Sequence, residues 1–301
     1  MSSYNKHATT IECQLELLKQ RGLIIRDEGK SSENLLDIGY YRFCFYLFPF
    51  EITYPSKRNR THEVESGTVF DDALWLYYFD FDMRQTLMRY LLRLEISLRT
   101  KMIYLISNKY PQSSTWFVDT SIVANSFAHD FPQKVYTSDF LKNGAIKSHH
   151  KKYINDKYAP AWKTLEFMTF GSIIKLYESL KDTDDKLLVS KEFGINQTAV
   201  FESYMKAMQA LRNICAHGAV LFDSRLPQSI NNGPAGRLGA CKQSLGGMIR
   251  VLSYLIGQIS QNRKSDLVEK VREIYSDLQN KSPKAYCKLL NITKFNPNAD
   301  I

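Results

Sequence analysis

The chain has 301 residues, of which 44% are hydrophobic and 24% charged. This balance is ordinary for a soluble globular protein and excludes long disordered stretches as the default. Forty Lys and Arg against 31 Asp and Glu give a net charge of +9, which suits a polyanionic partner without identifying one. The length is sufficient for one large helical body with a sizeable core.

Neither cysteine spacing nor targeting signals indicate a secreted, zinc-binding or membrane protein. The cysteines contain no Cys-x-x-Cys pair, so we expect reduced, mostly buried thiols and no metal site. The N-terminus lacks an apolar signal region, and the most apolar run, residues 40–54, is interrupted by charges and Pro49. We therefore expect a cytoplasmic location and no membrane partner. The cysteines are Cys13, Cys44, Cys215, Cys241 and Cys287.

The first 69 residues predict short helices and a basic loop. Apolar residues at helical spacing predict a helix over residues 10–22 that stops at Gly22, and residues 31–34 predict the cap of a second. An aromatic packing segment follows Gly39. Residues 54–67 are polar and predict a solvated loop whose basic side chains are candidate RNA contacts. These candidates are Lys57, Arg58 and Arg60.

The strongest helical pattern in the chain covers residues 70–108. Its apolar residues recur every three or four positions. Its basic residues are distributed around the axis and indicate either a solvated face or phosphate contacts. The apolar positions are Leu87, Leu91, Leu94, Leu98, Met102 and Leu105, and the basic ones Arg84, Arg89, Arg93, Arg99 and Lys101.

Glu95 on this helix has two interpretations. It stands four residues before Arg99, the favourable order for an ion pair on the surface of a helix. The alternative is a supporting carboxylate at an active site.

Residues 111–160 show poor periodicity. Near their end lies a basic run for which we expect solvent exposure, with RNA backbone contact as the alternative. His149 and His150 are adjacent, so they point in different directions and make a poor metal chelate. The candidate RNA contacts in this run are Lys147, Lys151 and Lys152.

The remaining pattern is helical to near the C-terminus. Residues 161–180 predict a helical region with a kink or boundary at Gly171, followed by a charged turn at 181–186. A helix beginning at Thr198 has one apolar stripe that ends near Cys215. A loop at 231–236 then precedes helices over about 243–261 and 265–279. No strand-like alternation competes, so the sequence predicts a mainly α, all-α fold.

The helix beginning at Thr198 carries Arg212, Asn213 and His217, spaced R-N-x-x-x-H. Arginine is a permanent cation whose planar donors match phosphate oxygens, and histidine titrates near neutrality. At about 100° per residue, Arg212 and His217 lie roughly 140° apart around the helix. Gly218 indicates that the helix ends there and frees the imidazole. Two copies facing each other would combine two arginines and two histidines in one site.

Segments over most of residues 11–226 resemble the Abi-like (AbiD/AbiF) family of bacterial abortive-infection proteins. The resemblance rests on residues 17–25, 38–42, 82–84, 95–99, 160–162 and 170–171, together with the motif itself. It implies a HEPN-type helical bundle, with a motif-bearing core at about 70–280 and an N-terminal extension at about 1–69, in a single domain covering 1–301.

The resemblance also implies a function. HEPN proteins of this kind are metal-independent endoribonucleases that need no cofactor and act as homodimers. His217 would then be the acid/base, Arg212 would bind the phosphate and Asn213 would orient the histidine or the RNA. Related toxins are controlled by protein or RNA antitoxins, so an RNA substrate and a regulatory RNA are the expected partners.

This sequence departs from many relatives directly after His217, where it reads Gly-Ala-Val-Leu-Phe-Asp in place of a second histidine and an Arg-Leu-Trp-Asn run. The departure bears on substrate preference and on activity. Two other functions remain open: an RNA-binding protein that inhibits growth by sequestration without cleavage, and a helical protein-interaction module.

Overall fold

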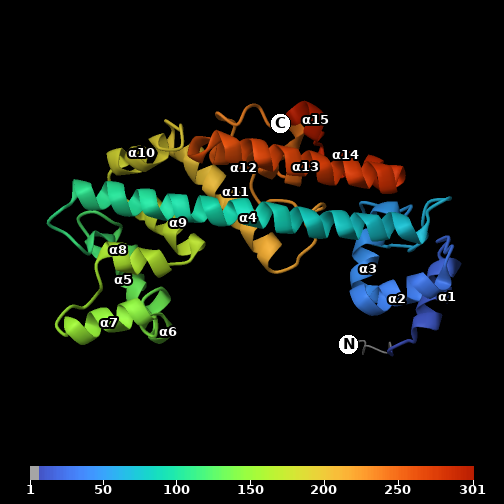
Figure 1. The fold of residues 1–301 in the computed structure, drawn as a ribbon, viewed down its shortest axis with the longest axis horizontal. Coiled ribbons are helices and arrows are strands. Elements are labelled where there is room, and N and C mark those ends of the chain that lie inside the picture. The colour runs from blue at the N-terminus through green and yellow to red at the C-terminus, as the bar shows by residue number, and fades with distance from the viewer. Residues whose placement is uncertain (1–6) are drawn as a thin grey trace.

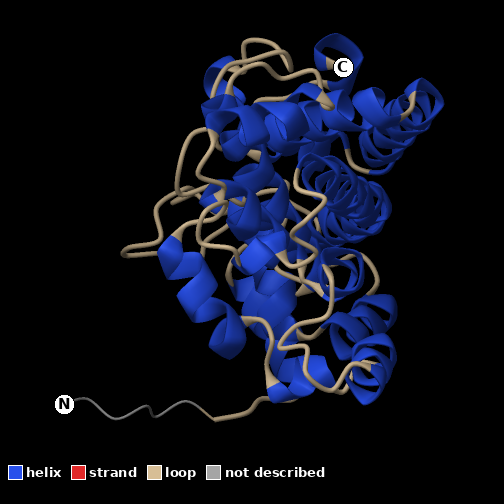
Figure 2. Cartoon of the chain, turned by 90° about the vertical axis from the view of Figure 1, so that its left-hand side faces the viewer, coloured by secondary structure: helices blue, strands red, loops and turns tan. Residues whose placement is uncertain are grey.

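The computed structural model describes residues 7–301, which form helices joined by loops and contain no β-strand (Figure 2). The all-α class predicted from the sequence is confirmed. The helices are α1 (Ile11–Gln20), α2 (Glu28–Ile38), α3 (Tyr40–Leu47), α4 (Phe70–Lys109), α5 (Asn125–Lys134), α6 (Ser138–Leu141), α7 (Gly144–Lys152), α8 (Ala161–Thr164), α9 (Phe170–Ser179), α10 (Thr183–Lys191), α11 (Thr198–Ala216), α12 (Leu245–Ile259), α13 (Gln261–Lys281), α14 (Pro283–Thr293) and α15 (Pro297–Asp300).

The 40-residue helix α4 is the centre of the fold. In Figure 1 it runs across the molecule, with α12, α13 and α14 along one side and α3 and α9 on the other. Its bounds agree with the predicted helix to within one residue. Five of the predicted stripe positions are fully buried, whereas the sixth, Leu105, is only partly buried and Ile106 takes its place in the core.

The two N-terminal helices differ in how well their starts were predicted. Helix α1 begins after Thr10, whose side chain accepts a hydrogen bond from the Cys13 amide, and Gly22 follows its end with a φ of +90°. Helix α2 begins earlier than predicted, because Asp27 caps it by accepting from the Lys30 amide at 2.9 Å. The expected cap at residues 31–34 is therefore wrong.

In the middle of the chain the predicted helix boundary near Gly171 is confirmed to within two residues, and one predicted turn is wrong. The boundary near Gly171 lies just before Phe170, where Thr169 caps α9. Gly171 is the second residue of α9, and a Cβ there would lie 2.5 Å from Gln209 Nε2 on α11, so the Gln209 amide would have to move. The predicted charged turn at 181–186 is the start of α10, which Asp182 caps by accepting from the Asp184 amide.

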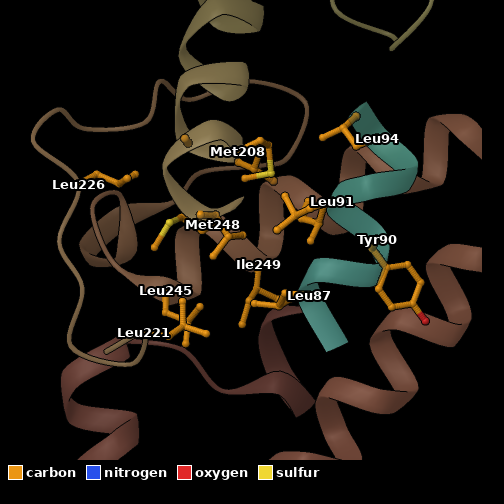
Figure 3. Packing of buried hydrophobic residues seen from close by; sticks show 14 of the residues in the cluster. Leu87, Tyr90, Leu91, Leu94, Met208, Leu221, Leu226, Leu245, Met248 and Ile249 are labelled. Atoms are coloured by element: carbon orange, nitrogen blue, oxygen red, sulfur yellow. The ribbon is translucent and has the colours of Figure 1, made fainter. Parts of the chain in front are cut away.

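The core between α4, α11 and α12 also holds the segment that follows α11. Figure 3 shows Leu87 and Leu91 of α4 close to Met248 and Ile249 of α12, with Leu221 beside Leu245. All six side chains are fully buried. The chain beyond α11 is thus anchored in the core immediately after the predicted motif.

None of the helices in residues 7–301 combines the length and the apolar character needed to cross a membrane. All five cysteines are free. The expectation that most are buried is wrong: Cys13 and Cys287 are exposed, Cys44 and Cys215 are partly buried, and only Cys241 is fully buried.

Candidate active site

The predicted motif lies at the C-terminal end of α11. Ala216 is the last helical residue, and the His217 amide donates to the Asn213 carbonyl at 3.0 Å. Gly218 follows with a φ of +66°, a left-handed conformation that suits glycine after a helix. The predicted end of the helix at this point is confirmed, and the His217 side chain stands on the exposed turn that follows.

The three motif side chains differ in burial and contacts. Arg212 is partly buried, and its Nη1 lies 3.5 Å from Asn213 Oδ1, at the limit of a hydrogen bond. Its Nε is buried without a hydrogen-bond partner. Asn213 and His217 are exposed, and within residues 7–301 no hydrogen bond or ion pair involves the His217 ring. Within residues 7–301, Arg212 therefore contacts Asn213, and no hydrogen bond joins the imidazole to either side chain.

A buried carboxylate on α4 fixes the segment after the motif. Asp80 is fully buried and accepts hydrogen bonds from the amides of Leu221, at 3.0 Å, and Phe222, at 2.8 Å. It also accepts from the Tyr46 hydroxyl at 3.0 Å, and its Oδ2 lies 3.4 Å from Nε of Arg84. Through Asp80, helices α3 and α4 position the backbone a few residues beyond His217.

Burial dominates the ionisation of two groups beside this segment. It raises the pKa of Asp80 to about 6, although the amides of Phe222 and Leu221 and the Arg84 guanidinium act in the opposite direction. Burial likewise raises the pKa of the Cys215 thiol to about 12, and the charge of Asp80 adds to this effect. A raised pKa favours the neutral thiol of Cys215 over the nucleophilic thiolate.

Two arginines from outside the motif lie beside Gly218. Arg42 of α3 donates from Nη1 to the Gly218 carbonyl at 3.0 Å. A Cβ placed on Gly218 would lie 3.4 Å from Nη1 of Arg84. Arg42 was not predicted as a site residue, and Arg84 was only one of five basic residues on its helix for which phosphate contact was an alternative to solvent exposure.

A sequence signal for Arg84 existed. Asp80 and Arg84 are four residues apart and in phase with the apolar stripe that continues at Leu87. A charged pair on the buried face of a helix needs a special environment, since buried charges are almost always paired. The reading of Arg84 and Arg99 as side chains on a solvated face is wrong, because they are only 7% and 8% exposed.

The predicted RNA-binding loop lies beside the segment that follows the motif. The Tyr54 hydroxyl donates to Asp223 Oδ1 at 3.1 Å, and the positive charge of Lys57 opposes the rise that burial causes in the pKa of Asp223. Lys57 and Arg58 are exposed.

Arg60 differs from the other two basic residues of this loop. Its Nε donates to Glu51 Oε2 at 2.8 Å, its Nη2 donates to Glu51 Oε1, and its guanidinium lies 4.3 Å from the ring centroid of Phe48. This arginine ties the loop to the end of α3, while Lys57 and Arg58 are free to meet a ligand.

The second basic segment is the short helix α7. Lys147, Lys151 and Lys152 are exposed, as predicted, but His149 is buried, with Nε2 3.1 Å from Asp156 Oδ2. His150 contacts the Tyr136 hydroxyl. Figure 1 shows α7 at the end of the molecule opposite α1–α3, so these lysines are not brought next to Arg42. Over residues 7–301, no three His, Cys, Asp or Glu side chains are grouped as a metal ion requires.

Glu95 forms the predicted pair with Arg99, at 2.9 Å, but not on the surface. The two side chains are only 12% and 10% exposed, and Arg99 also donates to the Met168 carbonyl at 3.0 Å. Glu95 Oε2 is buried without a partner. Among the described residues, the only ion pair of Glu95 is with Arg99, so its role as a supporting carboxylate stays a prediction.

Fold and site together define an all-helical protein that presents an R-N-x-x-x-H motif at the exposed end of one helix. Residues 33–223, well over half of the chain, match the family described as Abi-like protein. The chain belongs to the Abi-like family, as the resemblance implied. The matched region runs from α2 through the motif to Asp223. Membership suggests a role in abortive infection, a form of defence against phage. No curated protein and no solved structure matches the chain.

Proposed function

We propose that this protein is a HEPN-type endoribonuclease that acts in abortive infection and cleaves RNA without a metal ion. The observation that carries the proposal is the exposed His217 ring, which has no hydrogen-bond partner among residues 7–301 and directly follows the helix end that bears Arg212 and Asn213. Proton transfer requires that a ring nitrogen can reach the substrate, and the exposed imidazole of His217 meets this requirement.

The chemistry is an internal transfer within RNA. The 2′-oxygen attacks the adjacent phosphorus as its proton passes to a base, and the bond from phosphorus to the 5′-oxygen breaks as an acid protonates that oxygen. The products are a 2′,3′-cyclic phosphate and a 5′-hydroxyl. His217 serves as a proton carrier, and Arg212 stabilises the charge on the phosphate oxygens.

A homodimer would complete this site. One chain supplies a single motif histidine, whereas the reaction has a base step and an acid step at opposite sides of phosphorus. Arg212 also lies against its own Asn213 and has no hydrogen bond to His217 in the described chain. Two motif ends facing each other would offer one imidazole for each oxygen and two guanidinium groups for the phosphate.

The proposed biological role is that of a toxin active in the cytoplasm of an infected cell. A cell that carries such an enzyme has to keep it inactive until infection. The net charge of +9 favours an RNA among the partners that could do so, either as substrate or as antitoxin.

The test compares wild-type protein and the His217→Ala variant on total RNA in the presence of EDTA. Since His217 is exposed, alanine should leave the fold intact, which thermal unfolding would verify. The proposal expects cleavage by the wild type alone, with 2′,3′-cyclic phosphate ends. Equal cleavage by both proteins would remove His217 from the mechanism, and cleavage lost only in EDTA would refute metal independence.

The second candidate is an RNA-binding protein that inhibits growth by sequestration. The observation in its favour is that no hydrogen bond joins Arg212 to His217 within residues 7–301. This candidate expects RNA binding with a steep salt dependence in both wild type and His217→Ala, and no new RNA ends from either.

A further inference from the structure

Two guanidinium groups from different helices converge on the residue that follows His217. Arg42 comes from α3 and Arg84 from α4. Arg42 Nη1 is 3.0 Å from the Gly218 carbonyl oxygen, and a Cβ on Gly218 would lie 3.4 Å from Arg84 Nη1 and 3.9 Å from Arg42 Nη2. Two like charges therefore lie side by side at the edge of the candidate active site.

Arg84 is held in a way that leaves its tip free. The residue is 93% buried, and Nε bonds to the Asp80 carbonyl at 3.2 Å and lies 3.4 Å from its carboxylate. These contacts fix the direction of the side chain. Neither of its Nη atoms has a hydrogen-bond partner within residues 7–301, and neither is among the fully buried unpaired atoms, so both donors reach solvent.

The local charge balance is positive. Asp80 is the carboxylate paired with Arg84, and its oxygens are already occupied by the amides of Leu221 and Phe222 and by the Tyr46 hydroxyl. Arg42 has no carboxylate partner in the described part of the chain. Guanidinium donors form strong, charge-assisted hydrogen bonds to phosphate oxygens.

A phosphate that binds near His217 lies at the C-terminal end of α11 and needs the positive charges of Arg42 and Arg84. The last carbonyl groups of α11 carry partial negative charge, which disfavours a phosphate near His217. Arg42 places one cation beside this helix end by donating to the carbonyl of Gly218, two residues beyond α11, and Arg84 adds a second cation within the same few ångströms. A polyanion can then lie across the end of the helix.

We propose that Arg42 and Arg84 form a second phosphate subsite, which binds the RNA backbone next to the scissile phosphate. The inference rests on the proposed function and extends it to the substrate class: single-stranded RNA held through its phosphates, without selection among bases at this subsite. The strand would run from the Arg212 and His217 groups toward α3 and α4, passing close to Lys57.

The experiment measures RNA affinity in the His217→Ala background, so that no substrate is cut. A labelled single-stranded RNA is titrated over a series of salt concentrations with Arg42→Gln and, separately, Arg84→Lys added. The matched control is Arg263→Gln, which removes the same charge from an exposed position on α13. Thermal unfolding of every variant reports on folding.

Loss of one phosphate contact should weaken binding about tenfold and make the negative slope of log K against log salt shallower by about 0.7. We expect this for Arg42→Gln, with no change for Arg263→Gln. Arg84→Lys keeps the charge but loses the planar fork, so it should weaken binding with little change in slope. A purely structural role would lower the unfolding temperature without moving the slope.

The outcomes separate this inference from the nuclease proposal. Unchanged affinity and slope in Arg42→Gln overturn the subsite even if the wild type cleaves RNA, and so does the absence of any RNA binding. A shallower slope of log K against log salt in Arg42→Gln upholds the subsite even if the wild type cleaves nothing. If Arg84→Lys fails to fold, Arg42→Gln decides, because within residues 7–301 the only side-chain hydrogen bond of Arg42 is to the Gly218 carbonyl.

Discussion

Replacing Gly218 with alanine tests how the end of α11 positions His217. The φ of +66° at this residue costs an L-amino acid about 1–2 kcal/mol relative to glycine. The new methyl group would also lie 3.4 Å from Nη1 of Arg84, a side chain that Asp80 holds in place. We therefore expect Gly218→Ala to lower the free energy of unfolding by about 1–2 kcal/mol.

The assay is urea unfolding followed by circular dichroism, with Gly22→Ala as the matched control. Gly22 also follows a helix with a positive φ, +90°, but the nearest atoms to its Cβ, in Val64, are at an ordinary 3.7 Å. The two variants should lose similar stability. Only Gly218→Ala should also slow RNA cleavage, by about 10–100-fold, because a small displacement of a catalytic group is costly.

Two results would refute this reasoning. Wild-type stability in Gly218→Ala would mean that the left-handed conformation is not required after α11. Equal cleavage rates in the Gly22 and Gly218 variants would mean that the conformation of Gly218 does not control the imidazole.

Three further predictions concern buried groups. Burial raises the pKa of Asp80 from 3.8 to about 6, so the stability that protonated Asp80 contributes is complete below about pH 4 and is lost as the pH rises through 6, by roughly 3 kcal/mol. Asp80→Asn should therefore flatten the profile of unfolding free energy against pH between these values. An unchanged profile would contradict the raised pKa of Asp80. Arg99→Met should lower the free energy of unfolding in urea by about 3–5 kcal/mol, because it leaves the Glu95 carboxylate buried and unpaired. A decrease below about 1 kcal/mol would show that Glu95 has another partner. In the folded protein, the exposed Cys13 and Cys287 should react rapidly with Ellman's reagent. Cys215 should react slowly, because its pKa of about 12 disfavours the thiolate. Rapid modification of Cys215 would show that the end of α11 opens readily.

The sequence predicted the long elements well because their signals are local. Helices α4 and α11 each carry an apolar stripe at helical spacing, and the structure buries those stripes almost as predicted. The glycine after His217 likewise marks the end of α11 correctly. Short elements such as α10 were missed because a run rich in Lys and Asp has no apolar periodicity, although Asp182 is a good cap.

The surroundings of the motif could not be predicted in the same way. Arg42 and Gly218 are 176 residues apart in sequence, and Asp80 and Leu221 are 141 apart. Such pairs depend on how α3 and α4 pack against the chain after α11, which no local pattern specifies. Glu95 shows the same limit: its spacing from Arg99 predicted the ion pair, but not that the pair would be largely buried or that Arg99 would also donate to the Met168 carbonyl.

The central position of helix α4 also affects how the protein unfolds. At 1.5 Å per residue its 40 residues span about 60 Å, and they pack against α3, α9, α10, α11, α12, α13 and α14. Fraying of any one neighbour leaves the others attached, whereas opening α4 in the middle separates nearly all of them at once. The amide hydrogens around Leu91 and Leu94 should accordingly exchange with solvent only through global unfolding. A protease should likewise cut at these residues only after the chain has unfolded.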